Sequence, residues 1–281
     1  MNSYFKLTIL LFVLVFTSCE DVIDVDVQEA PSRLVIEASL DWEKGTTGNN
    51  QTIKLSKSTP YFDANTNVSV TNASVKVTND DSAQEFVFTH QANGIYTTNQ
   101  FVPVTNATYT LEVVYEGETY TANETLTTVT DITNITQSVE DGFDDEALEF
   151  NVVFTDPVDE ENYYLFKVQR QGDLLPELED VDDEFVNGNE ITWWFENEED
   201  EDTDKIEEYK PGDIVDISFF GISEAYHNYI KVLIEQSEGA GLFSTTPVPL
   251  KGNCINTTTP DNYAYGYFRV TQVVKTSYTF Q

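Results

Sequence analysis

The sequence predicts a mainly β protein with two β-sandwich domains and one amphipathic helix in the second domain. Short segments rich in β-branched and aromatic residues alternate apolar and polar positions, as half-buried strands do. Clusters of Asn, Asp, Gly and Ser separate these segments. No helical crossover interrupts about 100 residues after residue 30, which favours sandwiches of the immunoglobulin or fibronectin type over a parallel sheet.

The N-terminal segment has the order of a secretory signal. Lys6 precedes an apolar run of about ten residues, roughly half of what an α-helix needs to cross a membrane. The small residues Thr17 and Ser18 then lead to Cys19, and "VFTSC" resembles the lipobox of bacterial lipoproteins, whose cysteine is acylated. An ordinary cleaved signal with a chance cysteine is the alternative. We expect residues 1–18 to be a signal peptide and an acylated Cys19 to anchor the chain in membrane lipid.

The composition bounds the partners. The chain has 50 Asp and Glu against 14 Lys and Arg, a formal net charge of −36. Such a chain repels phosphate backbones and anionic lipid surfaces, so nucleic acid is not an expected partner. Its hydrophobic content of 40% provides material for a folded core. With Cys19 acylated, Cys254 has no intrachain disulfide partner, and we expect it to be buried in or near a strand.

Residues 19–29 form a predicted acidic tether, and residues 30–128 form the first predicted sandwich. Its strands include "RLVIEASL", "TIKLSKS", "SVKVTND" and "EFVFTH". The clearest signal is "TYTLEVVYEGETYTA". It contains an apolar row on one face, made of Tyr109, Leu111, Val113 and Tyr115. Because Glu116 and Gly117 occupy the turn, the segment predicts a two-residue β-hairpin.

Residues 129–281 form the second predicted sandwich. We expect "EALEFNVVFTDP" and "NYYLFKVQR" to pair as a hairpin, with further strands at "EITWWFE", "DIVDISFFGI", "YFRVTQVV" and "SYTF". Residues 223–238 predict a helix, because their apolar residues recur at helical spacing, Ser223 can cap the first turn and two following glycines can end it. This helix should pack against the second sheet or bridge the two domains.

Two long acidic segments of the second domain are predicted to be solvated loops. One contains Asp200, Asp202 and Asp204 at the alternating positions of an EF-hand loop. Lys205 and Pro211 then occupy positions where such a loop needs Gly and Glu. We therefore expect no specific metal site and no cofactor beyond weakly bound calcium, which at millimolar concentration would order this loop.

Catalytic chemistry has little support in the sequence. The two histidines, His90 and His227, fall in different predicted domains, and no Ser, His and Asp constellation is apparent. Paired carboxylates serve glycosidases, but the chain has so many acids that proximity in sequence discriminates nothing. We predict a protein that is not an enzyme, with a carboxylate-dependent hydrolase as a remote alternative.

Adjacent aromatic residues are the candidate contact residues. Trp193 and Trp194 are consecutive on a predicted strand, so their side chains point to opposite faces. One can enter the core, while the other can stack on a sugar ring or fill a pocket of a partner. The alternative is that the helix or the other domain covers the second ring. Tyr163 and Tyr164 pose the same question.

Several motifs in a fixed order resemble a known lipoprotein family. They are "SCEDVIDVDV", "RLVIEASL", "TIKLSKSTPYFD", "ASVKVTND", "NGIYTT", "FTDPVDEENYYLFKV", "GLFSTTPVPLKGNCIN" and "YAYGYFRVTQVV". The resemblance is to the domain-of-unknown-function 4249 family of Bacteroidota, and it covers nearly the whole mature chain. It implies an accessory role beside TonB-dependent receptors of the outer membrane. Glu20 and Asp21 after the cysteine resemble a surface-export signal, and the family offers no catalytic residues to carry over.

The sequence therefore predicts a lipoprotein of the outer membrane that faces the cell exterior. We expect it to act as a non-enzymatic binding module for a TonB-dependent transporter. The lipid anchor would raise the effective concentration of the protein near that transporter. A free-standing glycan- or peptide-binding lipoprotein is the alternative. The aromatic residues named above would then contact that ligand.

Overall fold

The computed structural model of the chain describes residues 31–60, 68–142, 146–158, 161–182, 188–197, 208–237 and 249–281. Residues Ser32–Gln281 form one compact unit. The predicted signal peptide and tether, with Cys19, Glu20 and Asp21, lie outside the described residues, and so do the three alternating aspartates of the acidic loop. Within the described ranges, no helix is both long and apolar enough to span a bilayer.

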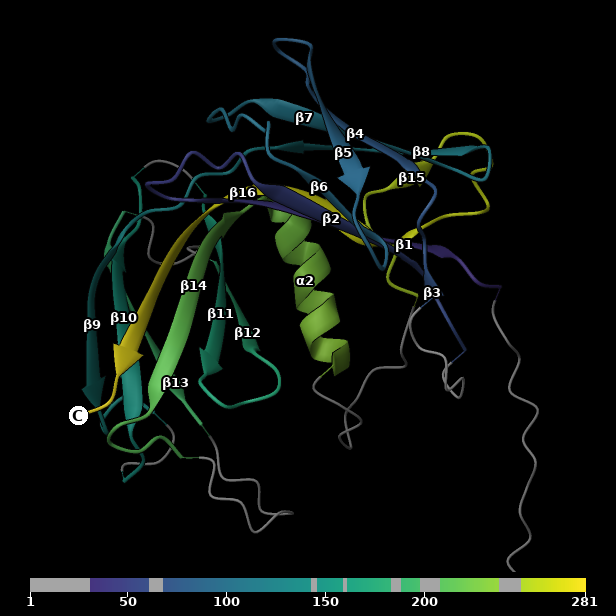
Figure 1. The fold of residues 1–281 in the computed structure, drawn as a ribbon. Helices are drawn as coiled ribbons and strands as arrows, with labels where there is room; N and C mark the ends of the chain where they lie inside the picture. Colours follow the sequence, from purple (N-terminus) through teal and green to yellow (C-terminus); the bar gives the residue numbers. More distant parts are fainter. Residues whose placement is uncertain are drawn as a thin grey trace, which may run out of the picture. The chain divides into compact units, whose positions relative to one another are not determined.

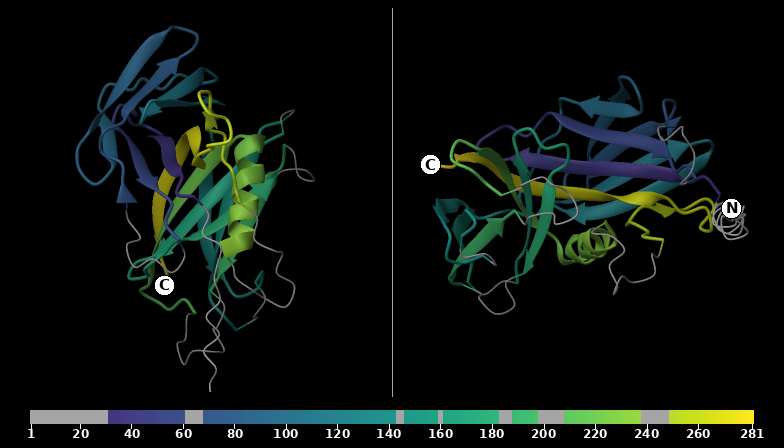
Figure 2. Two further views of the ribbon diagram at one scale, coloured as in Figure 1. Left: turned by 90° about the vertical axis from the view of Figure 1, so that its right-hand side faces the viewer. Right: turned by 90° about the horizontal axis from the view of Figure 1, so that it is seen from below.

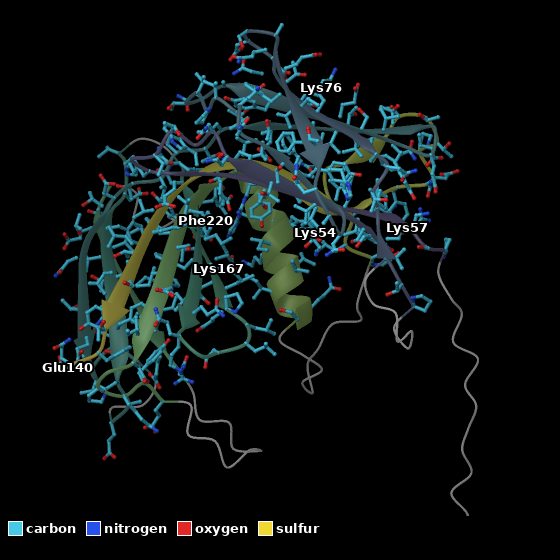
Figure 3. The ribbon with its side chains drawn as sticks, viewed as in Figure 1. Lys54, Lys57, Lys76, Glu140, Lys167 and Phe220 are labelled. Atoms are coloured by element: carbon cyan, nitrogen blue, oxygen red, sulfur yellow. The ribbon has the colours of Figure 1, made fainter. Side chains whose placement is uncertain are left out.

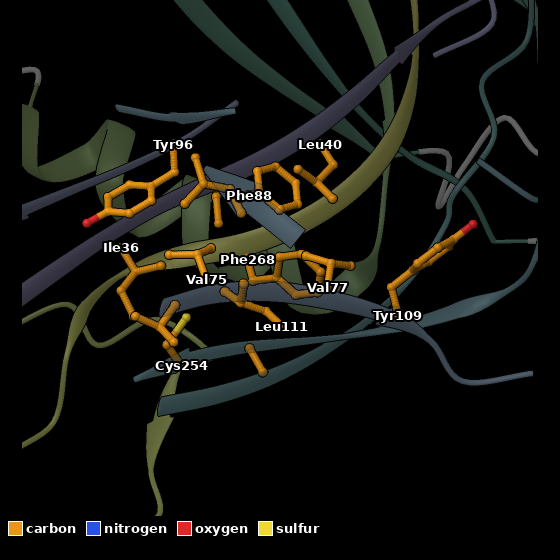
Figure 4. Close-up of a cluster of buried hydrophobic side chains, with 14 of the residues drawn as sticks. Ile36, Leu40, Val75, Val77, Phe88, Tyr96, Tyr109, Leu111, Cys254 and Phe268 are labelled. Carbon is orange, nitrogen blue, oxygen red and sulfur yellow. The ribbon is translucent and has the colours of Figure 1, made fainter. Parts of the chain in front are cut away.

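The protein is mainly β, as predicted, and its first half is a curled sheet (Figure 1). The strands of this half are β1 Leu34–Glu43, β2 Gln51–Lys57, β3 Val68–Ser69, β4 Ser74–Asn79, β5 Gln84–His90, β6 Ile95–Thr98, β7 Thr108–Tyr115 and β8 Glu118–Thr125. They lie in the order β1-β2-β6-β5-β4-β7-β8, with β3 beside β2. The curl brings apolar side chains of β1 and β6 together with those of β4, β5 and β7 in one core (Figure 4).

The predicted hairpin between β7 and β8 is confirmed. The two strands pair antiparallel with Tyr115 opposite Glu118. Glu116 and Gly117 have φ values of 51° and 83°, the left-handed conformations of a type I′ turn. Cys254 is buried in the core of this half, as expected, and burial raises the pKa of its thiol to about 12.

The second half contains two sheets with aromatic side chains between them. Its elements are β9 Ile132–Ser138, β10 Glu149–Thr155, β11 Tyr163–Arg170, β12 Glu177–Asp182, β13 Glu190–Glu196, β14 Ile214–Ile222, α2 Glu224–Ser237, β15 Ile255–Asn256 and β16 Tyr265–Thr279. One sheet has the order β13-β10-β9, and the other continues the first half as β12-β11-β14-β16-β1. The rings of Phe154 on β10 and Phe219 on β14 have centroids 4.7 Å apart, so the two sheets share one core.

The predicted hairpin between β10 and β11 is wrong. β10 pairs with β9 and β13, whereas β11 pairs with β12 and β14. The connection therefore crosses from one sheet to the other, and Phe154 meets Tyr164 across the core with ring centroids 5.2 Å apart. A strand buries one face whether the next strand pairs with it in the same sheet or lies in the opposite sheet. The alternation of apolar residues therefore cannot distinguish a hairpin from a crossing between sheets.

The last strand, β16, joins the two halves. The sequence suggested two strands here, but the structure has one. β16 pairs parallel with β1 from Val35↔Tyr265 to Glu43↔Val273, and antiparallel with β14 over its second half. Figure 2 shows β16, in yellow, running beside β1, in purple. β16 contributes Phe268 to the first core and Val274 to the second. The predicted division into two domains at residue 128 therefore stays a prediction.

Helix α2 covers the face of the second sheet that points away from the three-stranded sheet. Its predicted start is confirmed, because Ser223 Oγ accepts a hydrogen bond from the Tyr226 backbone N–H at 3.2 Å. Tyr226 and Ile230 pack against Leu165, Phe220 and other residues of β11, β14 and β16. The helix thus lies on the second sheet, one of the two predicted positions.

Candidate functional site

A groove of about 470 Å³ lies beside helix α2 and reaches β1, β11, β12, β14 and β16. We call it the α2 groove. Alternation along the strands explains how β1 and β16 contribute to it. On β1, the even-numbered residues from Leu34 to Leu40 are buried in the first core, so the odd-numbered Glu37 and Ser39 face the groove. On β16, Phe268 enters the first core and Tyr267 faces the groove.

The helix supplies the apolar wall of the α2 groove. Tyr226 and Ile230 are buried, Tyr229 is half-buried, and Leu233 is 39% exposed. These residues lie three or four apart, on one helix face. Burial raises the pKa of Tyr229 to about 12, and it also raises the pKa of Tyr267. Both phenols are therefore neutral at physiological pH and can donate hydrogen bonds.

The floor of the α2 groove contains the ion pair of a buried arginine with the half-buried Asp41. Arg269 is only 5% exposed, and its Nη2 donates to Asp41 Oδ1 at 2.8 Å. Its guanidinium carbon lies 4.7 Å from the ring centroids of both Phe220 and Tyr226, within the range of cation–π contacts. Burial lowers the pKa of Arg269, but Asp41, Tyr226 and Glu124 together outweigh this effect, so the pKa is raised. Its Nε is buried without a hydrogen-bond partner among the described residues.

The charges of the α2 groove suit recognition better than proton transfer. Glu37 Oε2 lies 2.8 Å from Lys54 Nζ, and Asp41 is paired with Arg269, so both carboxylates that line the groove already have a cationic partner. The two carboxylates do not form the pair of neighbouring acids that glycosidases use. Lys167 also lines the groove, so a bound segment would meet the apolar helix wall beside charges of both signs.

The family profile described as "Domain of unknown function (DUF4249)" matches residues 20–277. The chain belongs to this family. The match covers most of the chain and begins directly after Cys19. No curated protein matches the sequence of this DUF4249 protein.

Solved structures give only distant likenesses. A DUF4785 family protein from Legionella pneumophila is 12% identical with a TM-score of 0.26, and the match covers 69% of this chain and 54% of that one. A segment of two fibronectin type III domains from chicken tenascin is 14% identical with a TM-score of 0.21, over 60% and 83% of the two chains. The FN1–FN3 domains of chicken CNTN1 are 11% identical with a TM-score of 0.24, over 66% and 62%. This DUF4249 chain thus spans about half of the length of the Legionella protein.

The structure separates the two candidate tryptophans, which lie on strand β13. Ile191, Trp193 and Phe195 point into the second core, whereas Trp194 is on the opposite face with the exposed Thr192. Both tryptophans are half-buried. Trp194 is therefore the ring that faces away from the core, but it lies outside the α2 groove.

The two candidate tyrosines also separate. Tyr164 is 2% exposed in the second core, and its hydroxyl donates to Asp156 at 2.5 Å, so it cannot contact a surface ligand. The alternation of β11 turns Tyr164 inward, so it is the ring of this pair that enters the core. Tyr163 faces the helix side, where its ring lies 4.9 Å from that of His227. His227 is buried on helix α2, and its Nε2 lies 2.8 Å from Asp180. Tyr163 therefore packs in the contact between the helix and the sheet.

Sequence reasoning missed the floor of the α2 groove. Arg269 stands between Phe268 and Val270 in an apolar strand, and an arginine in such a position needs a partner because burying an unpaired charge is costly. That signal was present, but nothing in the sequence shows that Asp41 is the partner. In the part of the chain that the structure describes, no group of three His, Cys, Asp or Glu is placed to hold a metal ion.

Proposed function

We propose that the protein is a lipid-anchored module of the outer membrane that faces the cell exterior and binds a TonB-dependent transporter without catalysis. Cys19 would carry the acyl chains, and Glu20 and Asp21 would direct export to the surface. The family match from residue 20 onward supports this proposal, because the family domain begins where an acylated mature chain would begin. Two linked sandwiches, with β16 shared between them, would form the binding body.

The α2 groove is the observation that carries the binding role. It combines a partly exposed leucine and a neutral tyrosine on the helix with the carboxylates of Glu37 and Asp41 on β1. The net charge of −36 attracts a basic partner surface and steers its approach. We infer that the groove accepts an extracellular segment of the transporter in which an apolar side chain lies next to Lys or Arg.

Affinity purification from detergent-solubilised outer membranes tests this function. The groove variant is Leu233→Lys, which places a cation against a basic partner at a partly exposed position. Its matched control is Asn228→Lys, which adds the same charge to an exposed position of the same helix outside the groove. We expect the parent and Asn228→Lys proteins to retain a TonB-dependent receptor, and Leu233→Lys to retain at least about tenfold less, which corresponds to about 1.4 kcal/mol.

Two results would contradict the proposal. Absence of any such receptor from the parent sample under mild detergent conditions would remove the partner. Equal recovery with Leu233→Lys and Asn228→Lys would remove the α2 groove as the binding site. Circular dichroism of both variants checks that helix α2 is intact.

Glycan binding is the second candidate function, and a second groove favours it. This groove of about 620 Å³ lies across β2, β5 and β6 and is lined mostly by amide and hydroxyl side chains, among them Asn50, Thr52, Thr89 and Gln91. Such groups can hydrogen-bond to sugar hydroxyls. A glycan array tests it, with Thr52→Val as the variant; binding that survives in Thr52→Val would place a sugar elsewhere.

A further inference from the structure

Two cations share one tyrosine ring at the start of β1. The guanidinium carbon of Arg33 lies 3.6 Å from the ring centroid of Tyr263, and Lys251 Nζ lies 4.0 Å from the same centroid. We call Arg33, Lys251 and Tyr263 the Tyr263 cluster. The hydroxyl of Tyr265 is 3.5 Å from that of Tyr263. Lys251 is exposed, and the other members of the cluster are half-buried, so their polar atoms reach solvent.

The backbone holds the Tyr263 cluster in place. Arg33 Nη1 donates to the carbonyl oxygens of Asp261 and Tyr263 at 3.0 and 3.4 Å, which fixes the guanidinium plane. The backbone of Lys251 forms a β-bridge with Tyr265. The remaining donors of Arg33 are therefore positioned before any ligand arrives, which lowers the entropic cost of binding, and the ammonium of Lys251 lies over the Tyr263 ring.

The Tyr263 cluster brings together two cations that have no carboxylate partner among the described residues. Lys44, Lys54 and Lys76 each lie within 2.8 Å of a carboxylate. Arg33 and Lys251 form no ion pair within the described ranges, although the chain has 50 acidic residues. The pKa of Tyr263 is lowered, first by the hydrogen bond with Tyr265 and then by these two cations.

Two acidic side chains at this end, those of Glu118 and Glu116, have other partners. Glu118 Oε2 accepts hydrogen bonds from Tyr120, Asn256 and Asn262. Lys57, which is labelled in Figure 3, lies opposite Leu34 on the neighbouring strand. It pairs with Glu116 and lies 5.1 Å from the ring centroid of Tyr115. A second pair of a cation with a tyrosine thus stands at this end of β1.

The position of the Tyr263 cluster along the chain indicates its ligand. Arg33 is two residues after Pro31, where the described chain begins. Fully extended, residues 19–31 span at most about 45 Å, so a lipid on Cys19 would keep the cluster within that distance of the membrane surface. Tyrosine rings beside Lys and Arg are the side chains that favour the interface between lipid and water.

We propose that the Tyr263 cluster binds the phosphate of a lipid head group and holds this end of the Ser32–Gln281 unit against the membrane. The inference rests on the proposed acylation of Cys19, because a −36 protein without an anchor is repelled by anionic surfaces. Once the protein is anchored, repulsion between the membrane and the rest of the acidic surface disfavours contact there. The end with the Tyr263 cluster is then the one that docks. The α2 groove then has a fixed orientation relative to the membrane.

Lysine footprinting on vesicles tests the proposal. The mature chain from residue 19 is coupled through the Cys19 thiol to a maleimide lipid in phosphatidylcholine vesicles with one-fifth phosphatidylglycerol; Cys254 is too buried to compete. Because the coupling supplies the anchor, this result does not depend on native acylation of Cys19. Native acylation is measured separately by mass spectrometry. Lysine acetylation rates are then compared with those of the uncoupled Cys19→Ser chain. Lys210 is the internal control, since it is two residues before Gly212, whose backbone N–H donates to the carbonyl oxygen of Phe280 beyond the far end of β16.

We expect the acetylation of Lys251 to slow at least about fivefold on vesicles, while that of Lys210 is unchanged; fivefold corresponds to roughly the 1 kcal/mol of one basic residue near an anionic surface. The Arg33→Gln variant should lose most of this protection, and Lys210→Gln, which removes one charge elsewhere, should keep it. Equal acetylation of Lys251 in both states would overturn the proposal.

Two further outcomes would also overturn it. If inorganic phosphate protects Lys251 of the uncoupled chain as well as vesicles protect the coupled chain, the ligand is a free phosphate. If Lys251 of the uncoupled chain reacts slowly without any phosphate and vesicles add no further protection, a carboxylate of the chain itself occupies the cluster.

Discussion

At the residue scale, the ion pair of Arg269 with Asp41 determines how the α2 groove is built. Arg269 is almost fully buried between two aromatic rings, and Asp41 is its carboxylate partner. Removing one member of such a pair costs more than the pair contributes, because the remaining charge stays buried without compensation. The pair therefore fixes the position of β1 beside β16 on the groove side, in addition to the backbone ladder.

The first prediction concerns this pair. Asp41→Ala should lower the free energy of unfolding by about 3 kcal/mol, because Arg269 then keeps its charge in a buried site without a carboxylate. Glu37→Ala is the matched control on the same face of the same strand. Its ion pair with Lys54 is exposed, so its loss should cost less than about 1 kcal/mol. Urea denaturation measures both; equal losses would show that burial of Arg269 does not depend on Asp41.

At the element scale, the structure shows which features depend on local sequence. The β7–β8 hairpin was predictable because Glu116 and Gly117 specify its turn within two residues. The start of helix α2 was predictable because Ser223 caps it locally. The partners of β10 and β11, and the pairing of β16 with β1 across more than 200 residues, depend on contacts between distant segments. The α2 groove has residues from five strands and a helix, so it was not predictable from local patterns.

The second prediction tests the local signal at helix α2. Ser223→Ala removes the acceptor for the Tyr226 backbone N–H and should lower the free energy of unfolding by about 1 kcal/mol. Ser237→Ala, at the other end of the helix, removes an exposed hydroxyl that donates to the Ile234 carbonyl oxygen. That change should stay within about 0.5 kcal/mol. Thermal denaturation of the two variants compares them, and the idea of a capped start fails if Ser237→Ala costs as much as Ser223→Ala.

At the scale of the whole molecule, β16 connects two hydrophobic cores in one sheet. Its first residues pack in the core of the β1–β8 half, and its last residues pack beside Phe150 and Phe280 in the other. Its ladders with β1 and β14 overlap at Val273. Neither half can lose its structure without removing a strand from the sheet of the other, so the two cores should be thermodynamically coupled.

The third prediction is that residues Ser32–Gln281 unfold in a single transition. Trp42 packs against the first core and Trp193 against the second, so each reports on one half. Two variants are used: Trp42→Phe, which leaves the tryptophans of the second half, and Trp193→Phe/Trp194→Phe, which leaves Trp42. Within each variant, the urea midpoint from tryptophan fluorescence should equal the midpoint from circular dichroism. Phe219→Ala, a cavity in the second core that should cost about 3–5 kcal/mol, should then lower the midpoint seen by Trp42 as much as that seen by circular dichroism. Two separate midpoints would instead mean that the predicted sandwiches fold independently and that β16 only links them.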